Sequence, residues 1–285
     1  MRVSQSGVDK FSDCALAFQY SIENPVYYGG SVRAVGTAYH AGLEAAYPHR
    51  DQLGAFPPLD QIIKVAREAF KFEVAEAGDS FVWDEDIPDE TEAFRRIDGM
   101  LTHYFTFEGP DGPLPWPADF EVVGVEIPWE FDHAGVTITS RGIDLVLRDP
   151  NGWIIGVDHK TTKGKMWDQF KHHPRKKAQA PLYVWAMRQL YPDAPGHRFF
   201  YDIITPPGKR ETTLPKFERR CADCTDAQIA AALARVKAAA AMYEGYRSVG
   251  ADLPANPGST LCSRRYCDYF PVCPFGAVLD TPLPE

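Results

Sequence analysis

Two apolar stretches in the middle of the chain flank a short set of turn-forming residues. Gly142–Arg148 and Trp153–Thr161 are rich in aliphatic and β-branched residues, and Asp149-Pro150-Asn151-Gly152 lies between them. Apolar runs of this length, joined by such a tetrapeptide, are typical of a β-hairpin. The pattern therefore predicts two paired strands within residues 142–161.

This hairpin would bring charged side chains together at one end. Asp144 and Asp158 each lie seven positions from Asn151, so pairing about that residue places them roughly opposite each other. Side chains alternate between the two faces of a strand, and directly opposed residues share a face. We therefore expect Lys160 to join the two carboxylates on one face.

Two carboxylates held this close repel each other and raise one pKa unless a cation lies between them. Their oxygens favour a hard divalent ion, of which Mg²⁺ is the usual one, and Lys160 could hold or help to deprotonate an attacking water. An Asp-x-Lys sequence by itself is more often a solvated surface with an ordinary salt bridge. The second carboxylate at the mirror-image distance, Asp144, favours the metal site.

The rest of the chain shows helical and strand patterns in turn. Helices are expected at 10–20, 36–47, 58–78, 89–105, from 179 onward, and from a capping box at Thr225–Gln228 to about Ser248. Strands are expected at 120–129, 136–140 and 199–204, after a connector rich in Gly and Pro at 108–119. This order of elements indicates an α/β core that carries a helical N-terminal part.

Composition and charge restrict the environment of the protein. The chain has 285 residues, of which 45% are hydrophobic and 24% charged, enough to bury a substantial core. It contains no run of about 18 apolar residues, and its start lacks an apolar signal core, so we expect a cytoplasmic protein without a membrane span. The net charge of −9 argues against indiscriminate binding of nucleic acid.

One dense basic stretch nevertheless follows the hairpin directly. Its cationic residues are Lys160, Lys163, Lys165, Lys171, Arg175, Lys176 and Lys177, interleaved with Trp167 and Phe170. Such a segment suits contact with a phosphate backbone and stacking of bases. A solvated loop explains the charges alone equally well.

Three of the six cysteines gather in the tail, at Cys262, Cys267 and Cys273. In a reducing cytosol, closely spaced thiols indicate metal or cluster ligation rather than disulfides. The fourth ligand would be Cys14 or would come from the pair Cys221 and Cys224. The cysteine pattern leaves open a tetrahedral Zn²⁺ with that pair and a cubane iron–sulfur cluster with Cys14.

Other polar residues could support the candidate metal site. His40 lies one helical turn from Gly36 and from Glu44, and Gln179 lies one turn from Tyr183. Glu126, in a predicted strand, could contribute a third carboxylate. Taken singly, a helical histidine is usually a surface or satisfied core residue, and a strand glutamate is usually exposed or hydrogen-bonded.

In this order and spacing, the motifs resemble the RecB-like branch of the PD-(D/E)xK nuclease superfamily. The resemblance covers Cys14 to Cys273 and rests on Gly36-x-x-x-His40, Gly142-Ile143-Asp144, Asp158-His159-Lys160-Thr161 and Gln179-x-x-x-Tyr183. It is closest to the iron–sulfur members, which are AddB-type nuclease domains, CRISPR-associated RecB-like exonucleases and related phage enzymes.

The resemblance implies a restriction-endonuclease-like core, in which helices flank a mixed central sheet, within a single nuclease domain. Its parts would be a mainly helical segment at 1–119, the core at 120–250, and a tail at 251–285 that packs against Cys14. It also implies a [4Fe-4S] cluster whose ligands are Cys14, Cys262, Cys267 and Cys273. The four residues between Cys262 and Cys267 exceed the two-residue gap that we expect of such nucleases.

For the active site, the resemblance implies that His40, Asp144 and Asp158 bind the metal, together with the backbone carbonyl of His159. Lys160 would orient or activate the water. The side chains that support the site and the DNA strand would be Gln179 and Tyr183. Asp158 stands where Glu is commoner, a change that keeps the carboxylate.

We therefore expect a Mg²⁺- or Mn²⁺-dependent deoxyribonuclease, an exonuclease rather than an endonuclease, that acts on single strands or duplex ends while residues 163–177 guide the DNA. It would serve recombination, repair, or phage or CRISPR DNA processing, and a helicase, recombinase or CRISPR adaptation protein is a conceivable partner. One alternative is a non-catalytic DNA-binding subunit of a larger helicase or recombination complex. Another is a zinc-stabilised nuclease without iron.

Overall fold

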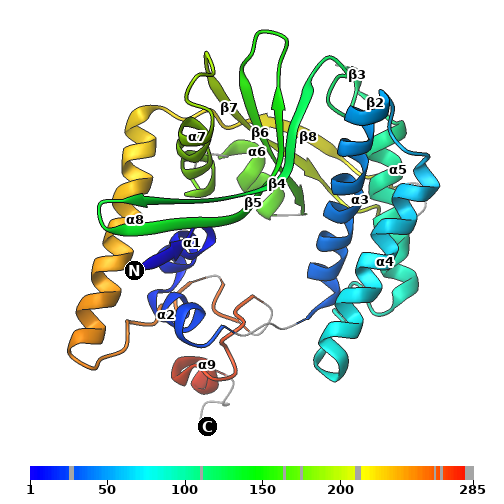
Figure 1. The fold of residues 1–285 in the computed structure, drawn as a ribbon. Helices are drawn as coiled ribbons and strands as arrows, with labels where there is room; N and C mark the ends of the chain where they lie inside the picture. The colour runs from blue at the N-terminus through cyan, green and yellow to red at the C-terminus, as the bar shows by residue number, and fades with distance from the viewer. Residues whose placement is uncertain are drawn as a thin grey trace.

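The protein is built around a six-stranded mixed sheet with helices on both faces (Figure 1). The computed structural model describes residues 1–25, 29–109, 112–162, 165–173, 176–208, 213–259, 261–263 and 266–279. The strands of the sheet are β1 (Arg2–Ser4), β4 (Glu121–His133), β5 (Val136–Arg148), β6 (Ile154–Thr161), β7 (His197–Ile204) and β8 (Phe217–Cys221). Their order is β1-β5-β6-β7-β8, with β4 also paired to β5, and the pairs β1–β5 and β6–β7 are parallel. The predicted α/β class and helix-flanked mixed sheet are confirmed.

The hairpin predicted from the apolar runs is formed by β5 and β6. Leu145 pairs with Val157 and Arg148 with Ile154, so the register is symmetric about Asn151. The strand expected at 136–140 is the first half of β5, which is long enough to pair with β1 near one end and β6 near the other. The local pattern therefore predicted the register correctly but divided one strand into two.

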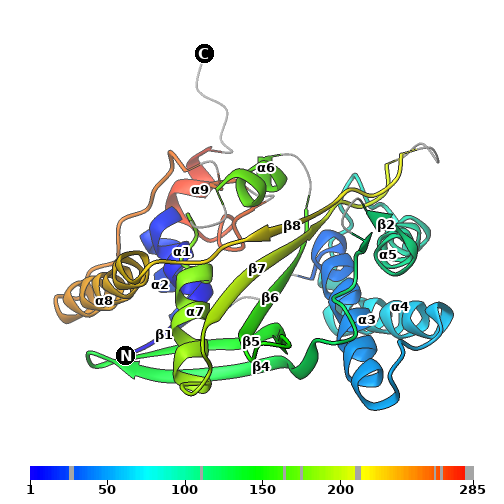
Figure 2. The same cartoon turned by 90° about the horizontal axis from the view of Figure 1, so that it is seen from above.

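Helices cover both faces of the sheet and create two apolar cores (Figures 1 and 2). On one face lie α1 (Gln5–Asp13), α7 (Gln179–Leu190) and α8 (Asp226–Ser248), and on the other lie α3 (Ser31–Leu53), α4 (Leu59–Ala77) and α5 (Glu90–Thr106). Successive residues of β6 point to opposite faces, so Ile154 belongs to the first core and Ile155 to the second. A strand buried on both faces reads as a continuous apolar run, as this one does.

The observed helices differ from the expected ones mainly near the N-terminus. The segment expected as one helix at 10–20 is two, α1 and α2 (Ala15–Glu23), and Cys14 lies between them in an extended conformation. The remaining elements are η1 (Gly78–Ser80), the short pair β2 (Glu108–Gly109) and β3 (Gly112–Pro113), α6 (Lys165–His172) and α9 (Pro274–Leu279). The capping box at Thr225 is present at the start of α8. Among the described helices, none is long and apolar enough to cross a membrane.

A buried arginine fixes the connector between the helical part and the sheet. Arg50, near the end of α3, is 5% exposed. Its guanidinium donates to the backbone carbonyls of Trp116 (2.8 Å), Pro117 (3.0 Å) and Phe120 (2.6 Å). The planar fork of arginine donates to all three carbonyls at once, of which the Pro117 carbonyl also accepts from the backbone N–H of Phe120.

Replacing this arginine should destabilise the whole fold. We expect Arg50→Met to lower the free energy of unfolding by about 2–4 kcal/mol, because the connector loses three hydrogen bonds from one buried guanidinium. Urea denaturation followed by circular dichroism measures the loss. The control is Arg148→Met, which removes an exposed ion pair with Glu121 and should cost less than about 1 kcal/mol. Equal effects of the two substitutions would contradict this account.

Candidate active site

Three acidic residues occupy neighbouring positions on three adjacent strands. Val125 pairs with Leu145 and Ile127 with Ile143, so Glu126 falls beside Asp144 on the β4–β5 pair. Continuing the β5–β6 register by one residue puts Asp144 beside Asp158. The sheet thus forces three carboxylates into one row where β5 and β6 stop pairing.

Glu126 reaches the site through an irregularity in β4. It has a φ of 48°, which is unusual for a residue with a side chain, and the β4–β5 register shifts between Ile127 and Trp129. Opposite this bend stands Gly142, where a Cβ would lie 2.6 Å from Glu126 Oε2 and 2.9 Å from its backbone carbon. Glycine at 142 therefore leaves room for the bent strand.

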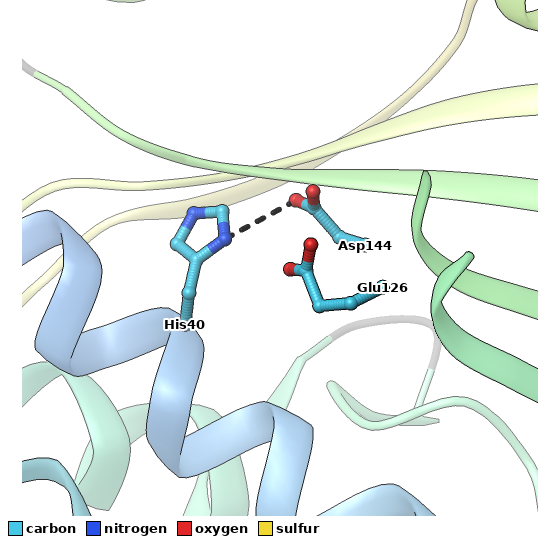
Figure 3. A group of neighbouring side chains, drawn as sticks. All are labelled: His40, Glu126 and Asp144. Carbon is cyan, nitrogen blue, oxygen red and sulfur yellow. Dashed lines mark ion pairs between the residues drawn. The ribbon is translucent and has the colours of Figure 1, made fainter. Parts of the chain in front are cut away.

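His40 completes the group from the face of α3. Ligand atoms of His40, Glu126 and Asp144 all lie within 4.8 Å of one another, and this is the one such set of three among the described His, Cys, Asp and Glu residues (Figure 3). His40 Nδ1 is 3.4 Å from Asp144 Oδ2. One turn earlier, a Cβ at Gly36 would lie 3.1 Å from Thr161 Oγ1, so the glycine allows α3 to approach the end of β6 closely.

The shifted pKa values of this group are those expected of a candidate cation site. Burial raises the pKa of Glu126 to about 7, and the charge of Asp144 adds to the effect. Burial, followed by the charge of Asp158, raises the pKa of Asp144 well above its ordinary value. Burial lowers the pKa of His40, which keeps a neutral imidazole with a free lone pair. One nitrogen and two crowded carboxylates are a donor set that fits Mg²⁺ or Mn²⁺.

Asp158 and Lys160 form a second group next to the first. Lys160 Nζ lies 2.5 Å from Asp158 Oδ2, and Gln179 Nε2 donates to the other oxygen, Asp158 Oδ1. Asp158 is 3% exposed, so both oxygens are held away from bulk water. The predicted proximity of Asp144, Asp158 and Lys160 is thus present, but Asp158 faces Lys160 and Gln179 rather than joining the His40 set.

The backbone and the ring of His159 have separate surroundings. Its backbone N–H donates to Asp144 Oδ2 over 2.7 Å. A hydrogen bond between the His40 ring and the His159 backbone partly offsets the lowering of the His40 pKa by burial. Its ring is 2% exposed among the rings of Tyr39, His40 and Tyr104, and burial lowers the pKa of the imidazole well below its usual range. The His159 backbone, expected as a ligand, therefore lies beside the Asp144 and His40 side chains.

Tyr183 supports the strand that carries the site. Its hydroxyl donates to the Gly142 carbonyl over 2.8 Å and lies 3.1 Å from Ser140 Oγ. Burial raises its pKa far above the ordinary value, so the phenol remains protonated. The hydroxyl proton is therefore used in the hydrogen bond to the Gly142 carbonyl, two residues before Asp144.

The basic segment is described only in part. Lys163 and Arg175 lie outside the described residues, and for Lys165 and Lys171 the structure describes the backbone of α6 but not the side chains. Lys176 is exposed. Lys177 lies 3.6 Å from Asp13, which directs it towards α1.

Four cysteines line one cavity between the N-terminal helices and the tail. Cys14, Cys262, Cys267 and Cys273 border a space of about 240 Å³. Cys221 and Cys224 do not line it: the first accepts from Arg198, and the second donates to the Ala222 carbonyl. The geometry therefore separates the tail thiols from Cys221 and Cys224, the pair that the zinc alternative requires.

Glu126 is predicted from the sequence only as a possible third carboxylate, whereas the expected metal ligands are His40, Asp144 and Asp158. The alternation of side chains in β4 indicates only a face, whereas the position of this carboxylate depends on a bend. The one sequence signal was Gly142 on the partner strand, since a glycine inside a strand often marks a bulge or a close approach.

Comparison with known proteins identifies a family and a similar fold. No curated protein matches the chain in sequence. A crystal structure from Eubacterium rectale, named a "Putative exonuclease", is similar over 100% of this chain and 90% of its own, with a TM-score of 0.52 and 11% sequence identity, a likeness of fold alone. The sequence model of the PD-(D/E)XK nuclease superfamily matches residues 2–274. Because that match spans nearly the whole sequence, the chain belongs to the PD-(D/E)XK nuclease superfamily.

Proposed function

We propose that this protein is a Mg²⁺- or Mn²⁺-dependent deoxyribonuclease that removes nucleotides from single strands or duplex ends. The observation that carries the proposal is the set of His40, Glu126 and Asp144 beside the Asp158–Lys160 pair. Membership of the nuclease superfamily supports DNA as the substrate. Exonuclease rather than endonuclease action follows the RecB-like resemblance and the name of the similar structure.

The residues divide the chemistry between them. His40, Glu126 and Asp144 would hold a divalent ion, and Asp158 and the His159 carbonyl are proposed as further ligands. When bound, the ion lowers the pKa of a water and polarises the phosphate. Lys160 would orient that water and donate hydrogen bonds to it, while Gln179 keeps Asp158 in place.

DNA would reach this site along the basic segment. Lys163, Lys165, Lys171, Arg175 and Lys176 are proposed to contact the phosphate backbone. The acidic total charge of the chain would restrict binding to this region. Recombination, repair, or phage or CRISPR DNA processing in the cytoplasm would suit such an enzyme, with or without a helicase partner.

The cysteine cavity would hold a [4Fe-4S] cluster with a structural role. Its four thiols come from both ends of the chain, which suits a clasp. A structural Zn²⁺, with Zn–S bonds of about 2.3 Å, is the alternative occupant.

Loss of the lysine should stop the reaction and leave the fold intact. We expect Lys160→Ala to reduce cleavage of end-labelled single-stranded DNA by at least about a hundredfold with Mg²⁺ or Mn²⁺, while the variant still folds and binds DNA. Lys64→Ala, on the exposed face of α4, is the matched control. Near-normal turnover in Lys160→Ala would refute the mechanism. Absence of cleavage by wild type with either metal, despite DNA binding, would favour the non-catalytic subunit instead.

Charge crowding predicts that a ligand substitution stabilises the metal-free protein. A carboxyl group whose pKa folding raises above 4.5 destabilises the folded state when it is ionised, as Glu126 is at pH 8. Glu126→Gln in EDTA should therefore stabilise by roughly 1 kcal/mol after solvent screening, or about 2 °C in melting temperature. Mn²⁺ should raise the melting temperature of wild type but have little effect on the variant. Glu121→Gln, exposed on the same strand, should behave as wild type in both conditions, and a variant that melts below wild type in EDTA would disprove the repulsion.

The nature of the cysteine site can be decided by its metal content. Anaerobically purified wild type should be brown and contain iron and sulfide, and Cys14→Ser should lose both, because the cluster needs four thiolates. Cys221→Ser and Cys224→Ser should keep the colour. Stoichiometric zinc in colourless wild-type protein would show that the cysteine site binds zinc and not a cluster.

A further inference from the structure

Helix α7, whose Gln179 side chain donates to Asp158 of β6, has no capping side chain of its own. Gln179 is the first residue of α7, and the N-cap residue before it is Ala178, whose methyl group cannot accept a hydrogen bond. Backbone N–H groups at a helix start have no partner within the helix. The beginning of α7 therefore depends on an acceptor from elsewhere.

That acceptor is Asp9 of α1, which lies beside α7 (Figure 2). Ala178 N donates to Asp9 Oδ1 over 2.9 Å, although the two residues are 169 positions apart. Arg235 of α8 lies 3.3 Å from the same oxygen and donates to Ser12 Oγ over 2.6 Å, which holds the carboxylate in place. The Asp9 side chain is 15% exposed, so water competes little for these hydrogen bonds.

This contact is one residue away from the reacting groups. Gln179, 9% exposed, donates to one oxygen of Asp158, and Lys160 binds the other at 2.5 Å. A shift of the first turn of α7 would move the Gln179 amide and release Asp158 to rotate. Displacements of about 1 Å at such a site can lower turnover by as much as a hundredfold.

We infer that Asp9 is a positioning residue of the active site: it caps α7 from a distant part of the chain and, through Gln179, sets the orientation of Asp158 and Lys160. Asp9 is not part of the His40, Glu126 and Asp144 group, and it borders the cysteine cavity. The inference rests on the proposed nuclease activity for its kinetic test but not for its structural one.

The kinetic test is a double-mutant cycle on a labelled single-stranded oligonucleotide. Asp9→Ala should lower kcat about tenfold and change KM less than about twofold, because the groups that bind DNA are untouched. In a Gln179→Ala background the same substitution should have no further effect, since the hydrogen bond from Gln179 to Asp158, through which Asp9 acts, is already absent. Asp9→Asn should keep wild-type kcat, because its amide oxygen still accepts from Ala178.

Asp226→Ala is the matched control, because it removes a carboxylate contact with Arg188 at the other end of α7. It should leave kcat unchanged. A wild-type kcat in folded Asp9→Ala, or the same loss in the Gln179→Ala background, would overturn the inference. If Asp9→Ala does not fold, Asp9→Glu replaces it: the charge stays but the acceptor moves, and an unaltered kcat would again refute the link.

Hydrogen exchange separates this inference from the proposed function. Amides of residues 178–180 and 182–184 should exchange faster in Asp9→Ala than in wild type or Asp226→Ala, with or without nuclease activity. Unchanged exchange there would reject the remote cap. If wild type cleaves no DNA, the proposed function fails, and the exchange result still decides whether Asp9 holds α7.

Discussion

Repulsion among carboxylates on adjacent strands is the constraint that the active site must satisfy. Strand pairing sets Glu126, Asp144 and Asp158 side by side, and burial removes the water that would screen them. Asp158 is balanced by Lys160 and Gln179, and Asp144 accepts the His159 backbone N–H. The carboxylates of Glu126 and Asp144 face His40, so the repulsion between them makes this group the candidate cation site.

Backbone features of the site serve this arrangement. The positive φ of Glu126 is unfavourable, and it is accommodated because Gly142 presents no side chain on the neighbouring strand. Gly36 in turn lets α3 lie against the end of β6, which brings His40 within reach of Asp144. Tyr183 then fixes the Gly142 carbonyl from the opposite face. Two glycines and one buried phenol thus position three candidate ligands that come from three different elements.

The N-terminal segment connects regions that are distant in sequence. β1 extends the sheet next to β5, α1 presents Asp9 to the start of α7, and Cys14 meets the tail thiols around one cavity. The backbone N–H of Asn256 lies 3.4 Å from Cys14 Sγ, and its side chain donates to the Asp13 carbonyl over 3.0 Å. Helix α1 therefore contacts both the cysteine cavity and α7, whose Gln179 side chain donates to Asp158.

The sequence by itself determined what depends on local periodicity. Turn residues between two apolar runs set the hairpin register, and with it the proximity of Asp144, Asp158 and Lys160, while helical spacing located α4, α5 and α8. Tertiary structure alone decided that Glu126 joins His40, that Asp158 faces Gln179, and that Asp9 caps α7. Those outcomes depend on a bent strand and on contacts between remote segments, and neither leaves a repeating pattern along the chain.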